Sequence, residues 1–208
     1  MPKQISFNIS GFIFLTFCLL SSCLSCYAKT NGGTEITNTD YMTHNDSLVM
    51  EIIEVYALDQ GIRDSAVHAF DEKSIAISRV DSICFSKAIM FIKKYGWPTK
   101  KMLGKYAGYE PAQAGFMPIM LHHPKKMVIP EIHDLLVKEV QKGNLNPKLC
   151  ALFFDKYWVC CQHKSLYNTS FKAWTKYNGV LREDKKQSDE LLKELGLDVL
   201  KDSDFIDK

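Results

Sequence analysis

The chain of 208 residues has few of the features that mark low-complexity, repetitive or strongly charged proteins. Its 7 prolines and 11 glycines are too few for a collagen-like or low-complexity chain, and no internal repeat is visible. Its 26 basic residues nearly balance its 24 acidic residues, so the net charge of +2 gives no strong overall attraction to nucleic acid. We therefore expect a single domain of ordinary size that does not bind nucleic acid.

Familiar motifs of catalysis and metal binding are also absent. The sequence contains no G-x-S-x-G motif, no C-x-x-C pair and no alternation of Cys and His at zinc spacing. Gly104–Gly108 lacks the Gly-Lys-Ser/Thr ending of a phosphate loop. A metal set of His122, His123 and His133 is disfavoured, because His133 falls on a different predicted helix. We expect neither a metal site nor a cofactor.

The seven cysteines do not form a recognisable disulfide framework. Three of them, Cys18, Cys23 and Cys26, belong to the N-terminal segment. The other four lie in a domain large enough to fold without disulfides, and we interpret them mainly as small buried hydrophobic residues: Cys84, Cys150, Cys160 and Cys161. Export would permit a disulfide, but the sequence does not select a pair.

The N-terminal segment has the layout of a secretory signal peptide. Lys3 precedes an apolar run from Ile5 to Leu20, and small residues follow it. The uninterrupted apolar core of about ten residues is shorter than the roughly 20 residues needed to span a bilayer. We favour a cleaved signal peptide over residues 1–22, and a retained transmembrane anchor is the alternative.

Two processing sites compete after the signal peptide. Leu20-Ser21-Ser22-Cys23 is typical of a bacterial lipobox, in which Cys23 carries the lipid that holds the mature chain on the membrane. The alternative is cleavage after Ala28, which gives a soluble secreted or periplasmic protein. We expect the lipid-anchored form, exported to the bacterial cell envelope and facing the periplasm or the cell surface. A polar tether over 23–45 then precedes a folded domain over 46–208.

The spacing of apolar residues predicts about five to six helices in this domain. Predicted helical segments include 49–56, 77–91, 111–123 and 130–143, followed by one that begins at 149 and one around 191–195. The second should stop at Gly96-Trp97-Pro98, because glycine suits the end of a helix and proline cannot continue it. Tyr157–Gln162 and Ser165–Phe171 are rich in β-favouring residues, which predicts a small hairpin near 157–171. The predicted fold is mainly α, a single-domain helical bundle with one small β-hairpin.

Several short motifs follow one another along the chain in an order that can be compared with known families. They are Asp59-Gln60-x-x-Arg63, Tyr95-Gly96-Trp97-Pro98, His123, Ala151-Leu152-x-x-Asp155-Lys156, Tyr167-x-Thr169 and Gly196-Leu197. Over about residues 50–200 this order resembles the mostly bacterial domain-of-unknown-function family 6624. Ser165, Asn168 and Ser170 stand where that family usually has Gln, Gly and Gln. The resemblance implies no reaction, because the family has no established activity.

Asp59 and Arg63 are the first candidate binding residues. They are four residues apart on a predicted helix, so they share one face and can form an ion pair. One interpretation is an ordinary ion pair near the end of the helix. The other is that Asp59 holds Arg63 so that its guanidinium binds an anionic group.

His123 and Asp155 are the candidate catalytic residues. His123 can act as a general base near neutral pH, particularly if Asp155 orients it. The alternative is a histidine that binds free carbonyl groups at the end of a helix. Three further candidates for binding are Trp97, Tyr167 and Thr169. Trp97 is either a rigid corner packed on the core or a stacking platform, and Tyr167 and Thr169 share one face of the predicted hairpin.

These polar residues lie in or beside apolar elements, which predicts one shared polar cleft for Asp59, Arg63, His123, Asp155, Tyr167 and Thr169. Two functions are compatible with such a cleft. We favour a binding or interaction module of the cell envelope that recognises a small ligand or an envelope protein. The alternative is an envelope hydrolase or transferase with a histidine base and an arginine that binds an anionic group.

Overall fold

The structure is a computed structural model that describes residues 44–69 and 75–207, with the backbone alone for 64–69. All of these residues belong to one unit of the chain, Met42–Lys208. The predicted signal peptide, Cys23 and residues 23–43 of the predicted tether lie outside the described residues.

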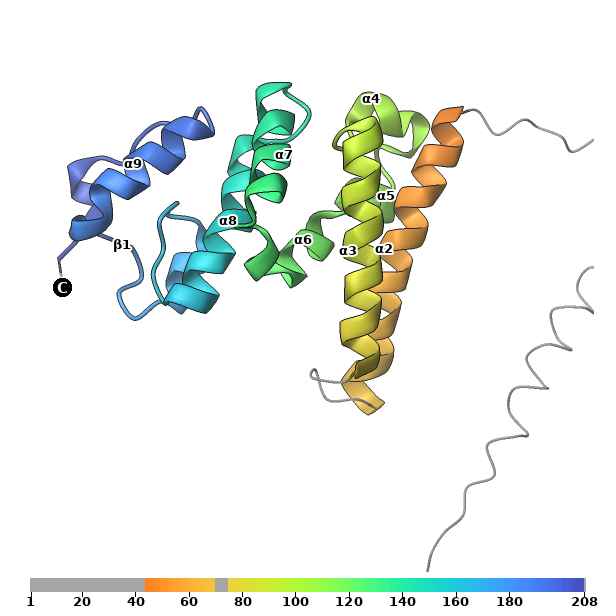
Figure 1. Ribbon diagram of the computed structural model, residues 1–208, viewed down its shortest axis with the longest axis horizontal. Helices are drawn as coiled ribbons and strands as arrows, with labels where there is room; N and C mark the ends of the chain where they lie inside the picture. Colours follow the sequence, from red (N-terminus) through yellow and green to blue (C-terminus); the bar gives the residue numbers. More distant parts are fainter. Residues whose placement is uncertain (1–43, 70–74, 208) are drawn as a thin grey trace, which may run out of the picture. The chain divides into compact units, whose positions relative to one another are not determined.

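The described residues are mainly helical, as the sequence predicts (Figure 1). They form eight α-helices: α2 (His44–Ala69), α3 (Ile75–Tyr95), α4 (Lys100–Leu103), α5 (Glu110–Ala114), α6 (Met117–His122), α7 (Pro130–Gln141), α8 (Pro147–Gln162) and α9 (Lys185–Glu194). Within residues 44–69 and 75–207, no helix combines the length and the apolar character needed to cross a membrane.

Helices α2 and α3 pack side by side (Figure 1). Each carries a carboxylate within its inward-facing stripe. On α2 the stripe consists of Leu48, Ile52 and Val55, which are all buried, and Asp59 continues it at the next turn. On α3 the residue in the corresponding position is Asp81, one turn before a buried run. The packing of the two helices therefore brings two acidic side chains toward each other.

The turn that ends α3 is fixed by the buried carboxylate of Glu139 in α7. The Trp97 amide and the Asn144 side chain both donate to its Oε2 at 2.8 Å, and Lys142 Nζ lies 2.7 Å from its Oε1. Gly96 adopts φ +85°, and a Cβ added there would lie 2.9 Å from Glu139 Oε2. The sequence correctly predicts that this helix stops at Gly96, and the structure shows why a glycine suits the position.

The structure contains more helices than the predicted five to six. The segment predicted as one helix over 111–123 is divided into α5 and α6 at Gly115, which has φ +46° and where an added Cβ would lie 3.3 Å from the Ile52 side chain. The short helix α4 adds another, because the Thr99 side chain caps it by accepting a hydrogen bond from Met102 N at 3.2 Å.

The prediction of a hairpin near 157–171 is wrong. Residues up to Gln162 belong to α8, which Asn146 caps and which ends at His163 in a left-handed conformation. The β-favouring side chains in this run are overruled by burial, because helical spacing places Phe153, Phe154 and Val159 in the interior. The following residues form a loop and the 3-10 helix η4 (Ser170–Trp174).

The strands lie elsewhere and pair differently. In the described part of the chain, β1 (Val180–Leu181) and β2 (Phe205–Ile206) form a two-stranded parallel sheet, with Val180 opposite Phe205. Parallel strands need a crossover connection, here the segment that contains α9, whereas a hairpin joins antiparallel strands directly.

The four cysteines in the described residues are free thiols. Cys84 and Cys150 are fully buried, as predicted for small hydrophobic residues, and burial raises the pKa of the Cys84 thiol to about 11. The same prediction is wrong for Cys160, which is exposed near the end of α8.

Candidate functional site

Asp59 is the centre of a charged cluster formed by α2, α3 and α6. Its side chain is fully buried, and its Oδ2 accepts a hydrogen bond from Gln60 Nε2 at 2.6 Å. Arg63, one turn further along α2, places Nη2 at 3.5 Å from Asp59 Oδ1. The i, i+4 pairing predicted from the sequence is therefore present.

Arg63 also connects α2 to α3. Its Nη2 lies 2.5 Å from Asp81 Oδ1, closer than it lies to Asp59. The Nε atom of Arg63 is buried and has no hydrogen-bond partner. The guanidinium group is therefore placed between two carboxylates but uses only part of its donor capacity.

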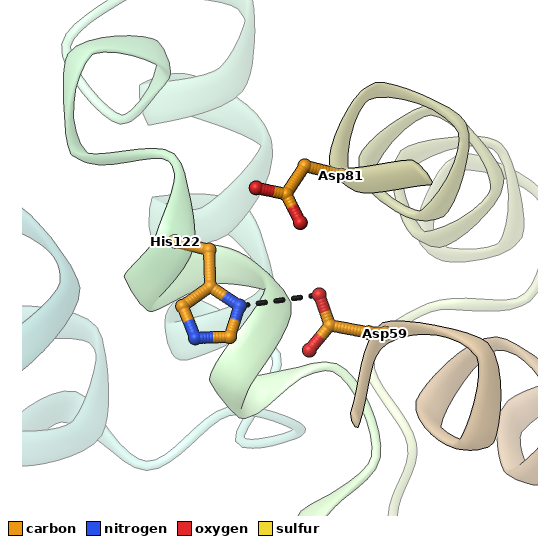
Figure 2. Close-up of side chains that lie close together, drawn as sticks. All are labelled: Asp59, Asp81 and His122. Atoms are coloured by element: carbon orange, nitrogen blue, oxygen red, sulfur yellow. Dashed lines mark hydrogen bonds and ion pairs between the residues drawn. The ribbon is translucent and has the colours of Figure 1, made fainter. Parts of the chain in front are cut away.

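The fourth side chain of the cluster is His122, which is the last residue of α6 (Figure 2). Its Nδ1 donates to Asp59 Oδ1 at 3.1 Å, and the ring is partly exposed, with a relative side-chain accessibility of 23%. A buried carboxylate that accepts from Nδ1 fixes the orientation of the imidazole. We call Asp59, Arg63, Asp81 and His122 the Asp59 cluster.

His123, the predicted catalytic base, makes its hydrogen bond and its ring contact outside this cluster. Its Nδ1 donates to the Ile119 carbonyl at 3.0 Å, and its ring packs on Phe85 with centroids 4.7 Å apart. Burial lowers the pKa of His123, although the hydrogen bond to Ile119 acts in the opposite direction. This geometry matches the alternative interpretation, a histidine that binds a carbonyl group near the end of a helix.

The charges around Asp59 change the pKa values of the ionisable groups near it. Burial raises the pKa of Asp59, but the hydrogen bond and charge of His122 and the charge of Arg63 outweigh it, so the pKa is lowered overall. Asp59 is therefore a buried carboxylate that stays ionised. Lys156 of α8 lies near enough that the charge of Arg63 adds to the effect of burial and lowers the Lys156 pKa.

The donor atoms of the cluster lie close enough to hold a metal ion. One ligand atom each from Asp59, Asp81 and His122 falls within 4.8 Å of the others, and among the described side chains these three form the only such group. Two carboxylates and one imidazole are a donor set used for divalent transition metals. In this conformation the guanidinium of Arg63 is the cation that contacts both carboxylates.

Asp155 has a different environment from the one predicted. It is fully buried on α8, and its carboxylate accepts hydrogen bonds from the loop that follows this helix. The donors are Ser165 Oγ (2.8 Å), Leu166 N (2.8 Å), Tyr167 N (3.2 Å), Thr169 N (3.3 Å) and Thr169 Oγ1 (2.6 Å). We call residues 165–169 the Asp155 loop. Asp155 holds this loop rather than orienting His123.

The Asp155 loop forms one wall of a groove of about 690 Å³, together with α8, the end of α9 and residues 197–200. The groove has apolar residues over much of its lining, and Lys148 and Asp198 contribute opposite charges. Tyr167 and Thr169 both line it, as expected for residues predicted to share a cleft. Burial raises the pKa of Tyr167, so its phenol stays neutral. We call this hollow the Tyr167 groove.

Trp97 lies in the core. It is buried, and its ring contacts Phe116 edge-on at 6.3 Å and Phe153 at 5.7 Å between centroids. Of the two alternatives for Trp97, these contacts match a rigid corner packed on the core rather than a stacking platform.

The six residues predicted to share one cleft therefore divide into separate groups. Asp59 and Arg63 belong to the Asp59 cluster, and none of the residues that line the Tyr167 groove belongs to that cluster. Asp81 is absent from the residues predicted from the sequence, and His122 is named there only in a disfavoured metal set. Asp81 could have been found as the acidic residue four positions after the buried Ile77 on the inner stripe of α3.

Comparisons with protein-family models, with curated proteins and with solved structures found no match to this chain.

Proposed function

We propose that the chain is an exported, lipid-anchored protein of the bacterial cell envelope, whose helices form one domain that acts as a binding module. The export and the lipid on Cys23 rest on the apolar run and on Leu20-Ser21-Ser22-Cys23. The resemblance to domain-of-unknown-function family 6624 remains part of this proposal. It rests on the order of the motifs in the chain.

The observation that carries the binding function is the Tyr167 groove with its fixed wall. A volume of about 690 Å³ is within the usual range for small-molecule sites, and apolar lining with a few polar groups is typical of them. The Asp155 loop is held by five hydrogen bonds to one buried carboxylate. A wall that is already ordered loses little conformational entropy when a ligand binds.

The lining also limits the class of ligand. Leu152, Leu197 and Leu200 offer apolar surface, while Ser170 offers a hydroxyl group nearby. We infer a small amphipathic molecule with an apolar body and a polar group. A ligand of this kind is a simpler occupant than a protein, because the groove has the dimensions of a small-molecule site.

The fluorescence of anilinonaphthalene sulfonate, a small aromatic anion, tests this proposal. We expect saturable binding to the purified chain, because the dye becomes fluorescent in apolar sites and Lys148 can attract its sulfonate. Leu152→Trp should abolish the signal by filling the groove. Ile83→Trp, at an exposed position on α3, is the matched control and should leave the signal unchanged. Equal dye binding by both variants would contradict the proposed site.

A second candidate function is an envelope hydrolase or transferase, and the hydrogen bond between Asp59 and His122 favours it. An imidazole oriented through Nδ1 by a buried carboxylate is the usual arrangement of a general base. In this candidate His122 takes the role predicted for His123, and Arg63 binds the anionic group. Hydrolysis of nitrophenyl acetate or nitrophenyl phosphate that is lost in His122→Ala but kept in His123→Ala would support it. Equal rates in the two variants would exclude a role for His122.

A further inference from the structure

The Asp59 cluster has the composition of a site for a divalent metal ion. Its three donor side chains come from three different helices, so helix packing rather than local sequence brings them together. Asp59 is fully buried and the Asp81 side chain is only 18% exposed, which distinguishes them from acidic residues that gather on a surface. The guanidinium of Arg63 contacts both carboxylates, which shows that this position accommodates a cation.

We propose that Asp59, Asp81 and His122 bind a divalent transition-metal ion, and that this ion displaces the guanidinium of Arg63. The ligands would be one carboxylate oxygen from each aspartate and Nδ1 of His122. This inference does not rest on the binding function of the Tyr167 groove, which contains none of these residues.

Two of the three ligand atoms already lie at a distance that suits one ion, and the Asp81 oxygen lies within 4.8 Å of both. His122 Nδ1 and Asp59 Oδ1 are 3.1 Å apart. Two atoms that each lie about 2.0–2.2 Å from the same ion are separated by about 3–3.5 Å in tetrahedral or octahedral geometry. Gln60 already donates to the other oxygen of Asp59, so it orients the carboxylate and leaves Oδ1 for the metal. Binding requires that Nδ1 gives up the proton it donates to Asp59, so that the neutral imidazole carries its proton on Nε2 and the metal replaces the hydrogen bond.

Charge explains why Arg63 has to leave. Two carboxylates and a divalent ion are neutral together, whereas a retained guanidinium would place a further positive charge beside the metal. Lys156 already contributes a positive potential at Arg63. The Arg63 side chain is 28% exposed and its Nε has no partner, so it can turn toward solvent with the loss of few hydrogen bonds.

Titration of the metal-free chain with Mn²⁺, followed by the electron paramagnetic resonance of the free ion, tests the proposal. Mn²⁺ is chosen because it prefers oxygen and imidazole ligands to thiolates, so the free cysteines do not compete. We expect one equivalent to bind. Removing the competing cation in Arg63→Gln should lower the Kd about tenfold or more. His122→Ala and Asp81→Asn should each abolish saturable binding.

His133→Ala is the matched control, because His133 also lies near two carboxylates, Asp134 and Glu194, but outside the cluster. It should bind Mn²⁺ like the unmodified chain. Circular dichroism of each variant establishes that it is folded. The proposal is overturned if neither the unmodified chain nor Arg63→Gln binds one equivalent of Mn²⁺. It is also overturned if folded His122→Ala binds as tightly as the unmodified chain. Dye binding in the groove is independent of either result.

Discussion

Replacing Asp155 with alanine should be among the most destabilising single substitutions in the folded unit. The carboxylate is fully buried and accepts five hydrogen bonds, three from backbone amides and two from hydroxyl groups. Alanine leaves all five donors without this acceptor. The hydroxyl groups of Ser165 and Thr169 can rotate toward other acceptors, but the amides of Leu166, Tyr167 and Thr169 are fixed by the backbone.

The magnitude follows from those three amides. A buried donor that loses its partner costs about 1–3 kcal/mol. Some relaxation of the loop is expected, so we predict that Asp155→Ala lowers the free energy of unfolding by about 3–6 kcal/mol. Asp155→Asn keeps the volume and one acceptor oxygen. If that oxygen faces Leu166 and Tyr167, the new amide group can donate to the two hydroxyls, and only the Thr169 amide is left without an acceptor. We expect a loss of about 1–3 kcal/mol for this variant.

Urea unfolding followed by circular dichroism measures both values. Asp202→Ala is the control, because the Asp202 side chain is 82% exposed and its ion pair with Lys185 is on the surface. A pair of this kind contributes about 0–1 kcal/mol. If Asp155→Ala loses no more stability than Asp202→Ala, the inference that Asp155 holds the loop is refuted. If the asparagine variant is as damaging as the alanine variant, the assignment of separate donors to the two oxygens is refuted.

Three further predictions concern other parts of the chain. Gly96→Ala should lower the free energy of unfolding by about 1–3 kcal/mol, because it combines a positive φ with a Cβ 2.9 Å from Glu139. Gly143→Ala has a similar positive φ without any atom within 4 Å of the added Cβ and should lose less. Equal losses in urea melts would exclude the clash. Burial raises the pKa of Glu139, but hydrogen bonds from Lys142, Asn144 and the Trp97 amide outweigh it and hold the pKa below its usual 4.5. The ionised Glu139 therefore stabilises the fold fully above pH 4.5, and this contribution is lost as the pH falls below that value. Urea melts of Glu139→Gln should show a weaker loss of stability on acidification than those of the unmodified chain. An equal change of unfolding free energy with pH in the two proteins would exclude this source of pH dependence. Mass spectrometry of membrane-fraction protein should find a lipid on Cys23, and an unmodified N-terminus at Lys29 would contradict the lipobox.

The helices were predictable where local signals agree with tertiary packing. The apolar spacing of α3 and α7 is regular, and Gly96 and Gly143 follow them in left-handed conformations. The run around Tyr157 was misread because its side chains favour strands in general, whereas here the neighbouring Phe153 and Phe154 are buried on one face of a helix. Propensity describes the side chain alone and contains no information about the surface against which it packs.

The candidate site was predictable only as far as local geometry extends. Asp59 and Arg63 are paired by their spacing on one helix, so the sequence suffices for them. Asp81 joins them through the packing of α3 on α2, which no local pattern specifies. The choice between His122 and His123 depends on the direction of two consecutive side chains. One residue of rotation on a helix turns a side chain by about 100°, so a helix boundary in error by one residue gives the wrong histidine.

Because Asp155 holds its loop mainly through the main chain, the shape of the Tyr167 groove depends little on which side chains line it. Three of the five donors are main-chain amides, which every residue except proline supplies. Asn168 occupies a left-handed position with φ +53°, and its amide is not among the donors to Asp155. Asn168 and Ser170 both line the groove, so exchanging them alters its chemistry without removing any bond to the carboxylate. The framework is therefore suited to diversification: a library that is randomised at position 170 and limited at position 168 to Asn, Asp and Gly, which tolerate a left-handed backbone, should keep its fold while its ligand preference changes.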